Sequence, residues 1–188
     1  SHYHADHANG IPQLLRRLDV GQIALPDVER DSPLRAEILA AAEKKGIPIL
    51  FVREKAEFGG VEEGFITVFP PMMEEGTVNE LGLTVLAAHG TLDVLITGDM
   101  EREGELRLVE EAALPEVEVL VAGHHGSDTS TTPELLEAVK PGLALISVGQ
   151  NNKYGHPDWD TLVRLDEIGA DIYRTDLYGT IEIQLNES

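Results

Sequence analysis

The 188-residue sequence contains no cysteine. Disulfide bonds, thiol catalysis and zinc or iron–sulfur sites with cysteine ligands are therefore excluded. No apolar run approaches the roughly 18 residues that a membrane-spanning helix needs. The opening Ser-His-Tyr-His has neither the basic start nor the apolar stretch of a signal peptide. What is present, 42% apolar and 26% charged residues, is an ordinary globular composition with enough chain for one domain, residues 1–188.

Basic residues are also scarce. The chain has 14 lysines and arginines against 34 acidic residues, which gives a formal net charge of −20. Nucleic-acid-binding proteins normally show the reverse balance, because their ligand is a polyanion. An acidic chain repels phosphate polymers and attracts cations. Any nucleic-acid function must therefore be reconciled with this charge.

Hydrophobic spacing predicts alternating helices and strands, with no internal repeat and no linker. Helices are expected over 11–18, 33–45, 101–113 and 158–168, and a further one begins at Pro133, capped by Thr132. Strands are expected over 20–25, 47–52, 64–69, 83–88, 92–97, 117–122, 143–148, 171–174 and 180–185. A meander and hairpin followed by alternating strands and helices indicates a layered α/β fold.

The first cluster of candidate metal ligands is His2-x-His4-x-Asp6-His7. On an extended backbone residues 2, 4 and 6 point to one side, and His7 joins them where the chain turns into the first helix. Imidazoles beside a carboxylate can supply ligands to two neighbouring metal ions. The alternative is a chance cluster or the remnant of a histidine tag. A tag would neither contain Asp6 nor run directly into an amphipathic helix.

Two apolar strands end in further candidates. Asp99 stands at the end of Thr97-Gly98-Asp99, at the strand edge where layered α/β folds bind ligands, and its carboxylate could bridge two cations. The same pattern also occurs in ordinary turns. Gly123-His124-His125-Gly126 follows a second buried strand, and its glycines allow close approach of the backbone. The alternative is a pair of surface histidines in a flexible loop.

A third group of candidates is weaker. His156, in Tyr154-Gly155-His156-Pro157, is either a site residue or part of a turn before a helix. Ser127 could contact a phosphate oxygen, or it could serve hydrogen bonding inside its own loop. Lys153 could guide phosphate, although isolated basic residues are usually only solvated. His89, at the expected hairpin tip, is taken as a solvated residue.

These motifs, in this order, resemble those of the metallo-β-lactamase superfamily, and more narrowly the C-terminal domain of ComEC-type DNA-uptake (competence) proteins. The flanking segments "LLRRLDVGQIALP", "GHHGSDTSTTPELLEAVKPGLALISVGQNNKYGHP" and "ADIYRTDLYGTIEI" resemble that domain as well. The likeness runs over essentially the whole chain. It implies an αββα sandwich with a binuclear metal site at the sheet edges, and hydrolytic, nucleolytic chemistry.

The resemblance also implies roles for individual residues. His2 and His4 correspond to ligands of the first metal, Asp6 and His7 to ligands of the second, and Asp99 to a bridge between them. His125 would complete the second site, with His124 as the alternative. His156 would be a further ligand, a phosphate contact or a general acid. Asp6 and His156 are therefore the candidate catalytic residues, and a ligand set without sulfur permits two Mn²⁺ or two Zn²⁺ ions.

The sequence departs from the family pattern in two places. The superfamily fold begins with strands upstream of the histidine motif, so this chain is expected to lack its N-terminal strands and to expose an apolar sheet face. Relatives often carry an Asn-x-Asn-Ser-like stretch before the Thr-Gly-Asp strand. Here the text reads Asn79-Glu80-Leu81-Gly82, which puts a substrate or supporting contact in doubt.

The resulting functional expectation is a metal-dependent phosphodiesterase or nuclease that acts on DNA during uptake. Two divalent ions would activate a hydroxide, and no nucleotide cofactor is expected. The partners implied are DNA and the membrane channel domain of the parent protein, which would sit in the cytoplasmic membrane with this domain outside. One alternative, favoured by the acidic surface, is a hydrolase of a lactam, lactone, thioester or phosphocholine ester. Another is a non-catalytic module that guides DNA.

Overall fold

The computed structural model describes residues 1–28, 31–60 and 64–184. The helices are α1 (Ala5–Ala8), α2 (Ile11–Arg17), α3 (Pro33–Lys45), α4 (Arg102–Glu111), α5 (Pro133–Val139), α6 (Trp159–Glu167) and α7 (Thr175–Tyr178). The strands are β1 (Ile23–Pro26), β2 (Ile49–Val52), β3 (Ala56–Gly60), β4 (Gly64–Phe69), β5 (Thr84–His89), β6 (Leu92–Ile96), β7 (Val119–Val121), β8 (Leu143–Ile146) and β9 (Asp171–Arg174). Among the described residues, no helix is long and apolar enough to cross a bilayer.

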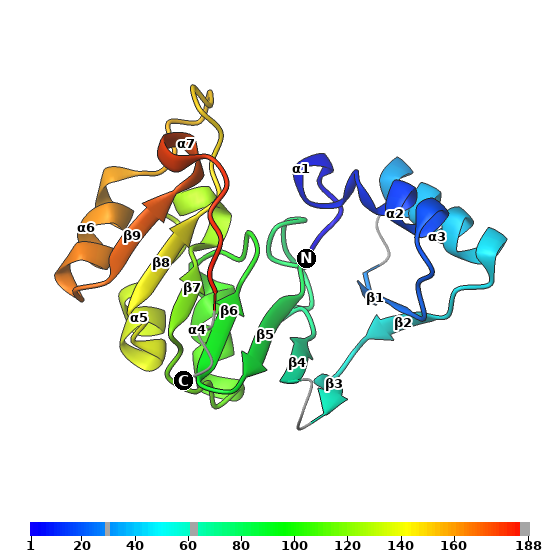
Figure 1. Cartoon of the computed structure of the whole chain (residues 1–188), viewed down its shortest axis with the longest axis horizontal. Coiled ribbons are helices and arrows are strands. Elements are labelled where there is room, and N and C mark those ends of the chain that lie inside the picture. Colours follow the sequence, from blue (N-terminus) through cyan, green and yellow to red (C-terminus); the bar gives the residue numbers. More distant parts are fainter. Residues whose placement is uncertain (29–30, 61–63, 185–188) are drawn as a thin grey trace.

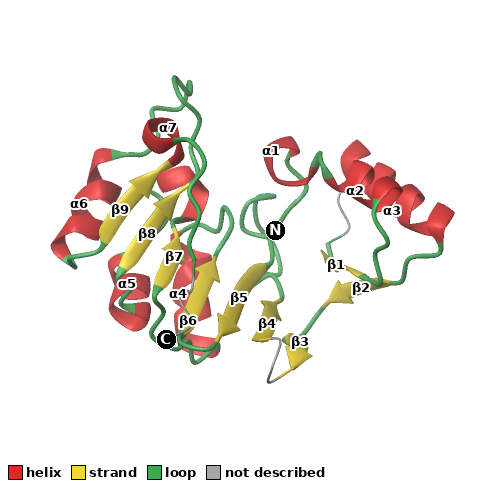
Figure 2. Ribbon diagram, viewed as in Figure 1, coloured by secondary structure: helices red, strands yellow, loops and turns green. Residues whose placement is uncertain are grey.

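Seven strands, β3 to β9, form one large sheet in sequence order (Figure 2). Strands β3 to β6 pair antiparallel, as a meander, and β6 to β9 pair parallel. In the parallel half every strand runs the same way, so the loops that follow β6, β7 and β8 emerge at one edge. The predicted site residues Asp99, His125 and His156 lie in those loops.

Helices α4, α5 and α6 cover one face of the large sheet. Leu120 of β7 and Ile146 of β8 are fully buried against Leu135 of α5 and Leu165 of α6. These strands are apolar because helices cover one face of the sheet and paired strands flank each of them on both sides. This core fixes the strand ends and, with them, the points at which the site loops begin.

A smaller parallel sheet, β1 and β2, is covered by α2 and α3 on its outer side, where Leu15, Leu25 and Ile38 are buried together. Val52 of β2 and Val68 of β4 belong to a third cluster, which joins the small sheet to the antiparallel half of the large one. Where the two sheets pack, the layers therefore run helix, sheet, sheet, helix, which is the αββα arrangement that the resemblance implied. In Figure 1 the small sheet stands beside the β3–β5 end of the large sheet.

Helix starts follow the sequence signals. The Ser32 hydroxyl accepts a hydrogen bond from the Arg35 N–H at the start of α3, and Gly46 ends that helix with φ +66°. The Thr132 hydroxyl accepts from the Leu135 N–H at the start of α5. Side-chain caps of this kind satisfy N–H groups that the first turn leaves unpaired. Both helices were predicted, and the structure confirms them.

Two sequence-based expectations need correction. The predicted strand over 180–185 is wrong for residues 181–184, which form no strand, while residue 185 lies outside the described residues. Alternating isoleucines produced a strand pattern, but the backbone of 181–184 joins no ladder of the two sheets, and Ile183 is 39% exposed. Strand β3 was missed because two of its five residues are glycines, which have low strand propensity.

The face of the large sheet opposite α4–α6 carries exposed apolar side chains. Ile96 alternates with the buried Leu95 and is 36% exposed, and Tyr173 alternates with Ile172 and is 41% exposed. Because side chains alternate across a strand, both point away from the helical layer. The expectation of an exposed apolar sheet face agrees with these positions.

The core assignment gives a stability prediction. Leu120→Ala should destabilise the domain by about 2–5 kcal/mol, because it removes buried methyl groups and leaves a cavity between sheet and helices. The same change at Leu14, which is 52% exposed on α2, should cost less than about 1 kcal/mol. Urea unfolding followed by circular dichroism measures both. Equal losses for the two variants would contradict the assignment of the core.

Candidate metal centre

The candidate site lies at the carboxyl edge of the large sheet, where the start of the chain meets the loops after β6, β7 and β8. The Ser1 carbonyl accepts a hydrogen bond from the Leu83 N–H, which docks the first residues beside β5. His2 lies two residues before His4, which has an extended backbone and is the N-cap residue of α1. Asp6 and His7 lie within that single turn. The histidine motif is thereby placed against the strand ends (Figure 1).

The first group of converging side chains is His2, His4 and Asp99, whose candidate ligand atoms lie within 4.8 Å of one another. His2 Nε2 is 2.9 Å from His4 Nδ1 and 3.7 Å from Asp99 Oδ2. His2 and Asp99 are 3% and 4% exposed. Two imidazole nitrogens and a carboxylate oxygen facing one point make a suitable donor set for a divalent cation.

The second group is Asp6, His7 and His125, again within 4.8 Å. His125 Nε2 lies 3.3 Å from Asp6 Oδ2 and 3.8 Å from Asp99 Oδ2. His7 Nε2 lies 3.1 Å from Asp99 Oδ1. Asp99 therefore contacts members of both groups, which is the geometry expected of a carboxylate that bridges two cations.

The orientation of the imidazoles also fits metal binding. His125 Nδ1 lies 2.7 Å from the Ser147 carbonyl oxygen, so Nδ1 carries the proton and the Nε2 lone pair is free. His7 Nδ1 lies 3.0 Å from the Ser1 hydroxyl. Although His7 Nε2 is close to Asp99, it is buried and makes no hydrogen bond. A buried nitrogen without a partner is costly unless a cation takes its lone pair, so these residues fit a binuclear site.

The electrostatics favour a neutral His2 beside an ionised Asp99. Burial, followed by the neighbouring His7, lowers the pKa of His2 to about 3. Burial acts to raise the pKa of Asp99, but the imidazole of His7, 3.1 Å away, together with His125 and His2, outweighs it and holds that pKa below its ordinary value. Neutral imidazole and ionised carboxylate are the forms that ligate metal ions.

The adjacent histidines 124 and 125 lie in different surroundings. Their φ angles are +49° and +57°, in the left-handed region, and the His124 N–H donates to the Gly98 carbonyl. His125 joins the second group, whereas His124 Nε2 is 4.0 Å from Asp99 Oδ2 and 3.4 Å from Asn79 Nδ2. His125 is thus the better placed of the two to complete the second site.

Asn79 was not among the sequence candidates. The structure places it in a cavity of about 420 Å³ that His4, Asp99 and His124 also line. Its Oδ1 is buried and has no hydrogen-bond partner. In the sequence, only its position in the loop before the hairpin that leads to Asp99 could have indicated a role for Asn79. That loop lacks the polar pair expected from the Asn-x-Asn-Ser-like stretch of relatives.

His156 lies on the wall of the same cavity. Its ring centroid is 5.7 Å from that of His124, and burial, followed by the charges of His124 and His125, lowers its pKa. Tyr154 stacks on His156 with ring centroids 5.9 Å apart and is 71% exposed. The Lys153 ammonium stands over the Tyr154 ring at 5.0 Å. Lys153 and His156 are therefore both close to the opening of the cavity.

Ser127 takes a different position. It is 4% exposed, its hydroxyl lies 3.0 Å from the Thr129 hydroxyl, and it also accepts the Thr129 N–H. It is absent from the residues that line the cavities around the two groups. This is the loop-internal hydrogen bonding that the sequence left open as the alternative to a phosphate contact.

Curated relatives resemble the chain over much of its length. ComE operon protein 3 of Bacillus subtilis (strain 168) is 30% identical over 182 residues, which is 97% of this chain and 24% of that protein. Competence protein ComA of Neisseria gonorrhoeae is 39% identical over 104 residues, 55% of this chain and 15% of that protein. The chain thus spans a quarter or less of the length of these relatives, which are competence proteins of the ComEC type.

A solved structure with a similar fold is CmlA, a diiron β-hydroxylase from Streptomyces venezuelae. It matches 93% of this chain and 42% of its own, with a TM-score of 0.62 and 17% identity, a likeness that shows the fold alone. The sequence model of the metallo-β-lactamase superfamily matches residues 1–150. With its ordered motifs gathered at one sheet edge, the chain belongs to the metallo-β-lactamase superfamily.

Proposed function

We propose that this chain is a metal-dependent phosphodiesterase domain that cleaves DNA during uptake. The observation that carries the proposal is the pair of three-residue groups that meet at Asp99 beside an open cavity. The competence relatives support the choice of DNA as substrate. The parent protein would hold this domain outside the cytoplasmic membrane and deliver the strand through its membrane channel domain.

His2 and His4 would hold the first divalent ion, Asp6, His7 and His125 the second, and Asp99 both. Two such ions, Mn²⁺ or Zn²⁺, lower the pKa of water and neutralise phosphate oxygens when bound. The protein's part is to orient these side chains, keep His2 neutral and keep Asp99 ionised. A donor set of nitrogen and oxygen without sulfur is compatible with either metal.

Asp6 and His156 have the positions required of groups that handle protons. Asp6 is exposed, lines the cavity, and can accept a hydrogen bond from the attacking water. His156 faces the same cavity, where it could protonate the leaving oxygen or donate an N–H to a phosphate oxygen. Its lowered pKa keeps it largely neutral near pH 7, which favours the phosphate contact there and the proton-donor role at lower pH.

The net charge of −20 supports a second candidate, a hydrolase of a small lactam, lactone, thioester or phosphocholine ester. It would use the same side chains and would not need a basic groove. A polyanion would instead have to be delivered by the rest of the parent protein. A purely DNA-guiding module is the least favoured alternative, because six converging donors serve no purpose in it.

The first prediction of the proposed function concerns Asp99. With Mn²⁺ or Zn²⁺, the chain should hydrolyse linear single- or double-stranded DNA, and Asp99→Ala should lower the rate by about two orders of magnitude or more, because one side chain serves both ions. Asp166→Ala, at an exposed position on α6, is the matched control and should keep full activity. Gel assays and metal analysis of the purified variants measure both effects.

The outcomes separate the candidates. Two bound ions without DNA cleavage, together with hydrolysis of small esters, would replace the nuclease by the small-molecule hydrolase. Failure to bind metal at all would reject both enzymatic functions.

A second prediction concerns pH and the metal-free protein. The pKa of His2 is about 3 when folded and 6.5 when exposed, so the unfolded chain binds more protons between these values. Stability should be fully present above pH 6.5 and should fall as the pH drops toward 3, by about 1.4 kcal/mol per pH unit from this residue. His2→Gln should flatten the dependence, and His89→Gln, at the exposed hairpin end, should not. Chemical unfolding of both variants at several pH values tests this, and identical slopes would contradict it.

A further inference from the structure

The loop of residues 127–132 follows the histidine pair along the chain and also contacts the segment that follows Asp99. The Ser130 hydroxyl donates to the Met100 carbonyl at 2.7 Å, and the Arg102 N–H donates to the Thr129 carbonyl at 2.8 Å. Both contacts hold the segment that directly follows Asp99. The loop therefore helps to fix the direction in which Asp99 leaves its strand.

The same loop also holds the histidine turn. The Thr131 hydroxyl accepts the Gly123 N–H at 3.1 Å, and the Ser127 N–H donates to the His124 carbonyl at 3.0 Å. The left-handed backbone of His124 and His125 is unfavourable for residues with a side chain, so it persists only if its surroundings impose it. Thr131 is itself left-handed, with φ +55°, and as a β-branched residue it needs the same support.

Two charged side chains secure this loop from opposite helices. Glu105 of α4 has no exposed surface, and its two carboxylate oxygens accept the N–H groups of Thr131 at 2.7 Å and Thr132 at 2.8 Å. Arg164 of α6 donates to the carbonyl oxygens of Thr131 at 3.1 Å and Ser130 at 2.9 Å. The Glu105 carboxylate thus accepts hydrogen bonds from N–H groups of the loop, and the Arg164 guanidinium donates hydrogen bonds to its carbonyls.

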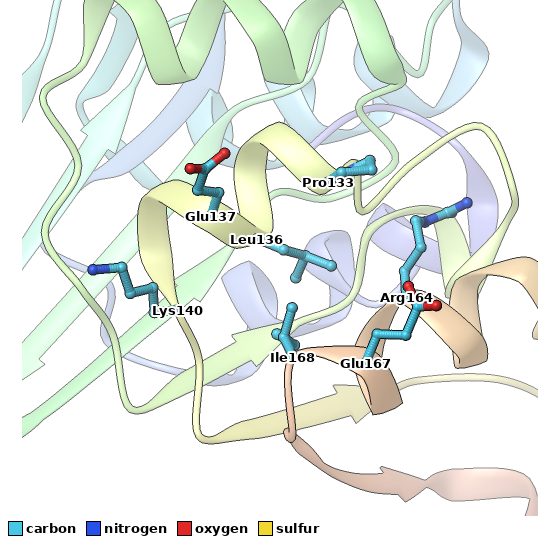
Figure 3. Close-up of a pocket in the computed structure, with 7 residues that line it drawn as sticks. All are labelled: Pro133, Leu136, Glu137, Lys140, Arg164, Glu167 and Ile168. Carbon is cyan, nitrogen blue, oxygen red and sulfur yellow. The ribbon is translucent and has the colours of Figure 1, made fainter.

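The Arg164 side chain reaches the loop from α6. Figure 3 shows it extending alongside the start of α5 at Pro133. Its guanidinium also donates to the Thr161 hydroxyl at 2.9 Å, which in turn donates to the Ser127 carbonyl. These contacts orient the guanidinium. A planar group with several fixed donors can hold adjacent carbonyls in a way that a lysine cannot.

We propose that Glu105 and Arg164 are positioning residues for the metal centre, acting as a buried clamp on loop 127–132 that orients both Asp99 and His125. Neither belongs to the two groups of candidate ligands, and neither lines the cavity beside them. Their effect passes through backbone hydrogen bonds to Met100 and Gly123, the immediate neighbours of Asp99 and His124. The inference rests on the proposed metal centre and is independent of the proposed DNA substrate.

The test is metal binding by Glu105→Gln and Arg164→Lys in the full chain. An amide keeps one acceptor oxygen and turns a donor toward the other N–H, and a lysine lacks the planar, fixed array of donors with which the guanidinium holds these carbonyls. Each variant should bind Mn²⁺ about tenfold more weakly, the lower end of what is typical when support for metal ligands is lost. The visible absorption bands of the Co²⁺-loaded protein should also shift, because they report ligand geometry.

Matched controls lie on α4, the helix that carries Glu105. Glu103→Gln and Arg107→Lys change the same groups in an exposed ion pair on α4, and should leave Mn²⁺ affinity and the Co²⁺ spectrum unchanged. Ile38→Val, in the core of the small sheet, controls for a general loss of stability. It should lower the melting temperature without changing either readout.

Two results would overturn the proposal. One is a folded Glu105→Gln or Arg164→Lys protein that melts earlier but binds metal with unchanged affinity and spectrum. The other is an equal loss of affinity in Ile38→Val, which would reduce the clamp to general stability. Arg164 is only partly buried and the lysine keeps its charge, so that variant decides the question if Glu105→Gln does not fold. Both readouts are made without DNA, so a failure of the nuclease proposal would not affect them.

Discussion

The candidate centre depends on one constraint: a nearly buried carboxylate, Asp99, must stay ionised while imidazole nitrogens converge on it. In most protein interiors such groups would hydrogen-bond to one another. Here His7 Nε2 lies 3.1 Å from Asp99 Oδ1 and remains without a hydrogen bond. Keeping donors in this state costs free energy in the absence of a cation, so the surrounding structure must hold them rigidly. Functional sites commonly retain such local strain against the rest of the fold.

The apolar core and the polar loops contribute differently to that rigidity. The core beneath β6, β7 and β8 decides where the strands end, because Leu95, Leu120 and Ile146 can be buried only in one register. It cannot decide which way the next residues turn. That direction is set by hydrogen bonds such as those from His124 N–H to Gly98 and from Ser130 to Met100. Many apolar sequences could bury the strands in this way, whereas the hydrogen bonds of the loops need particular side chains.

This difference between core and loops explains which features could be predicted from the sequence. The layered fold, the capped helices and the placement of Asp99 and the histidine pair at strand ends all follow from hydrophobic periodicity and short motifs. The choice between His124 and His125 did not, because it depends on two consecutive left-handed residues that are held by hydrogen bonds to Gly98 and to the loop that follows them, residues 127–132. Asn79 was missed because its loop reaches the site only through tertiary packing. The wrong prediction of a strand after residue 180 is the opposite error, since alternation predicts a strand even where, as in residues 181–184, the backbone pairs with no strand of the two sheets.

The acidic character of the chain can be viewed in the same terms. A charge of −20 is unfavourable for capturing a free polyanion from solution, yet it is favourable for concentrating divalent cations at a centre that needs them. Once two such ions are bound, the local field at the cavity is set by the ions rather than by the distant carboxylates, because bound cations are the largest charges in their surroundings. The long-range repulsion then governs how a strand approaches, and the local field governs what happens when it arrives. The chain aligns with about a quarter of a longer relative. In the proposed function, approach would then be the task of other parts of a parent protein, and a surface that rejects free nucleic acid would confine cleavage to the strands that those parts deliver.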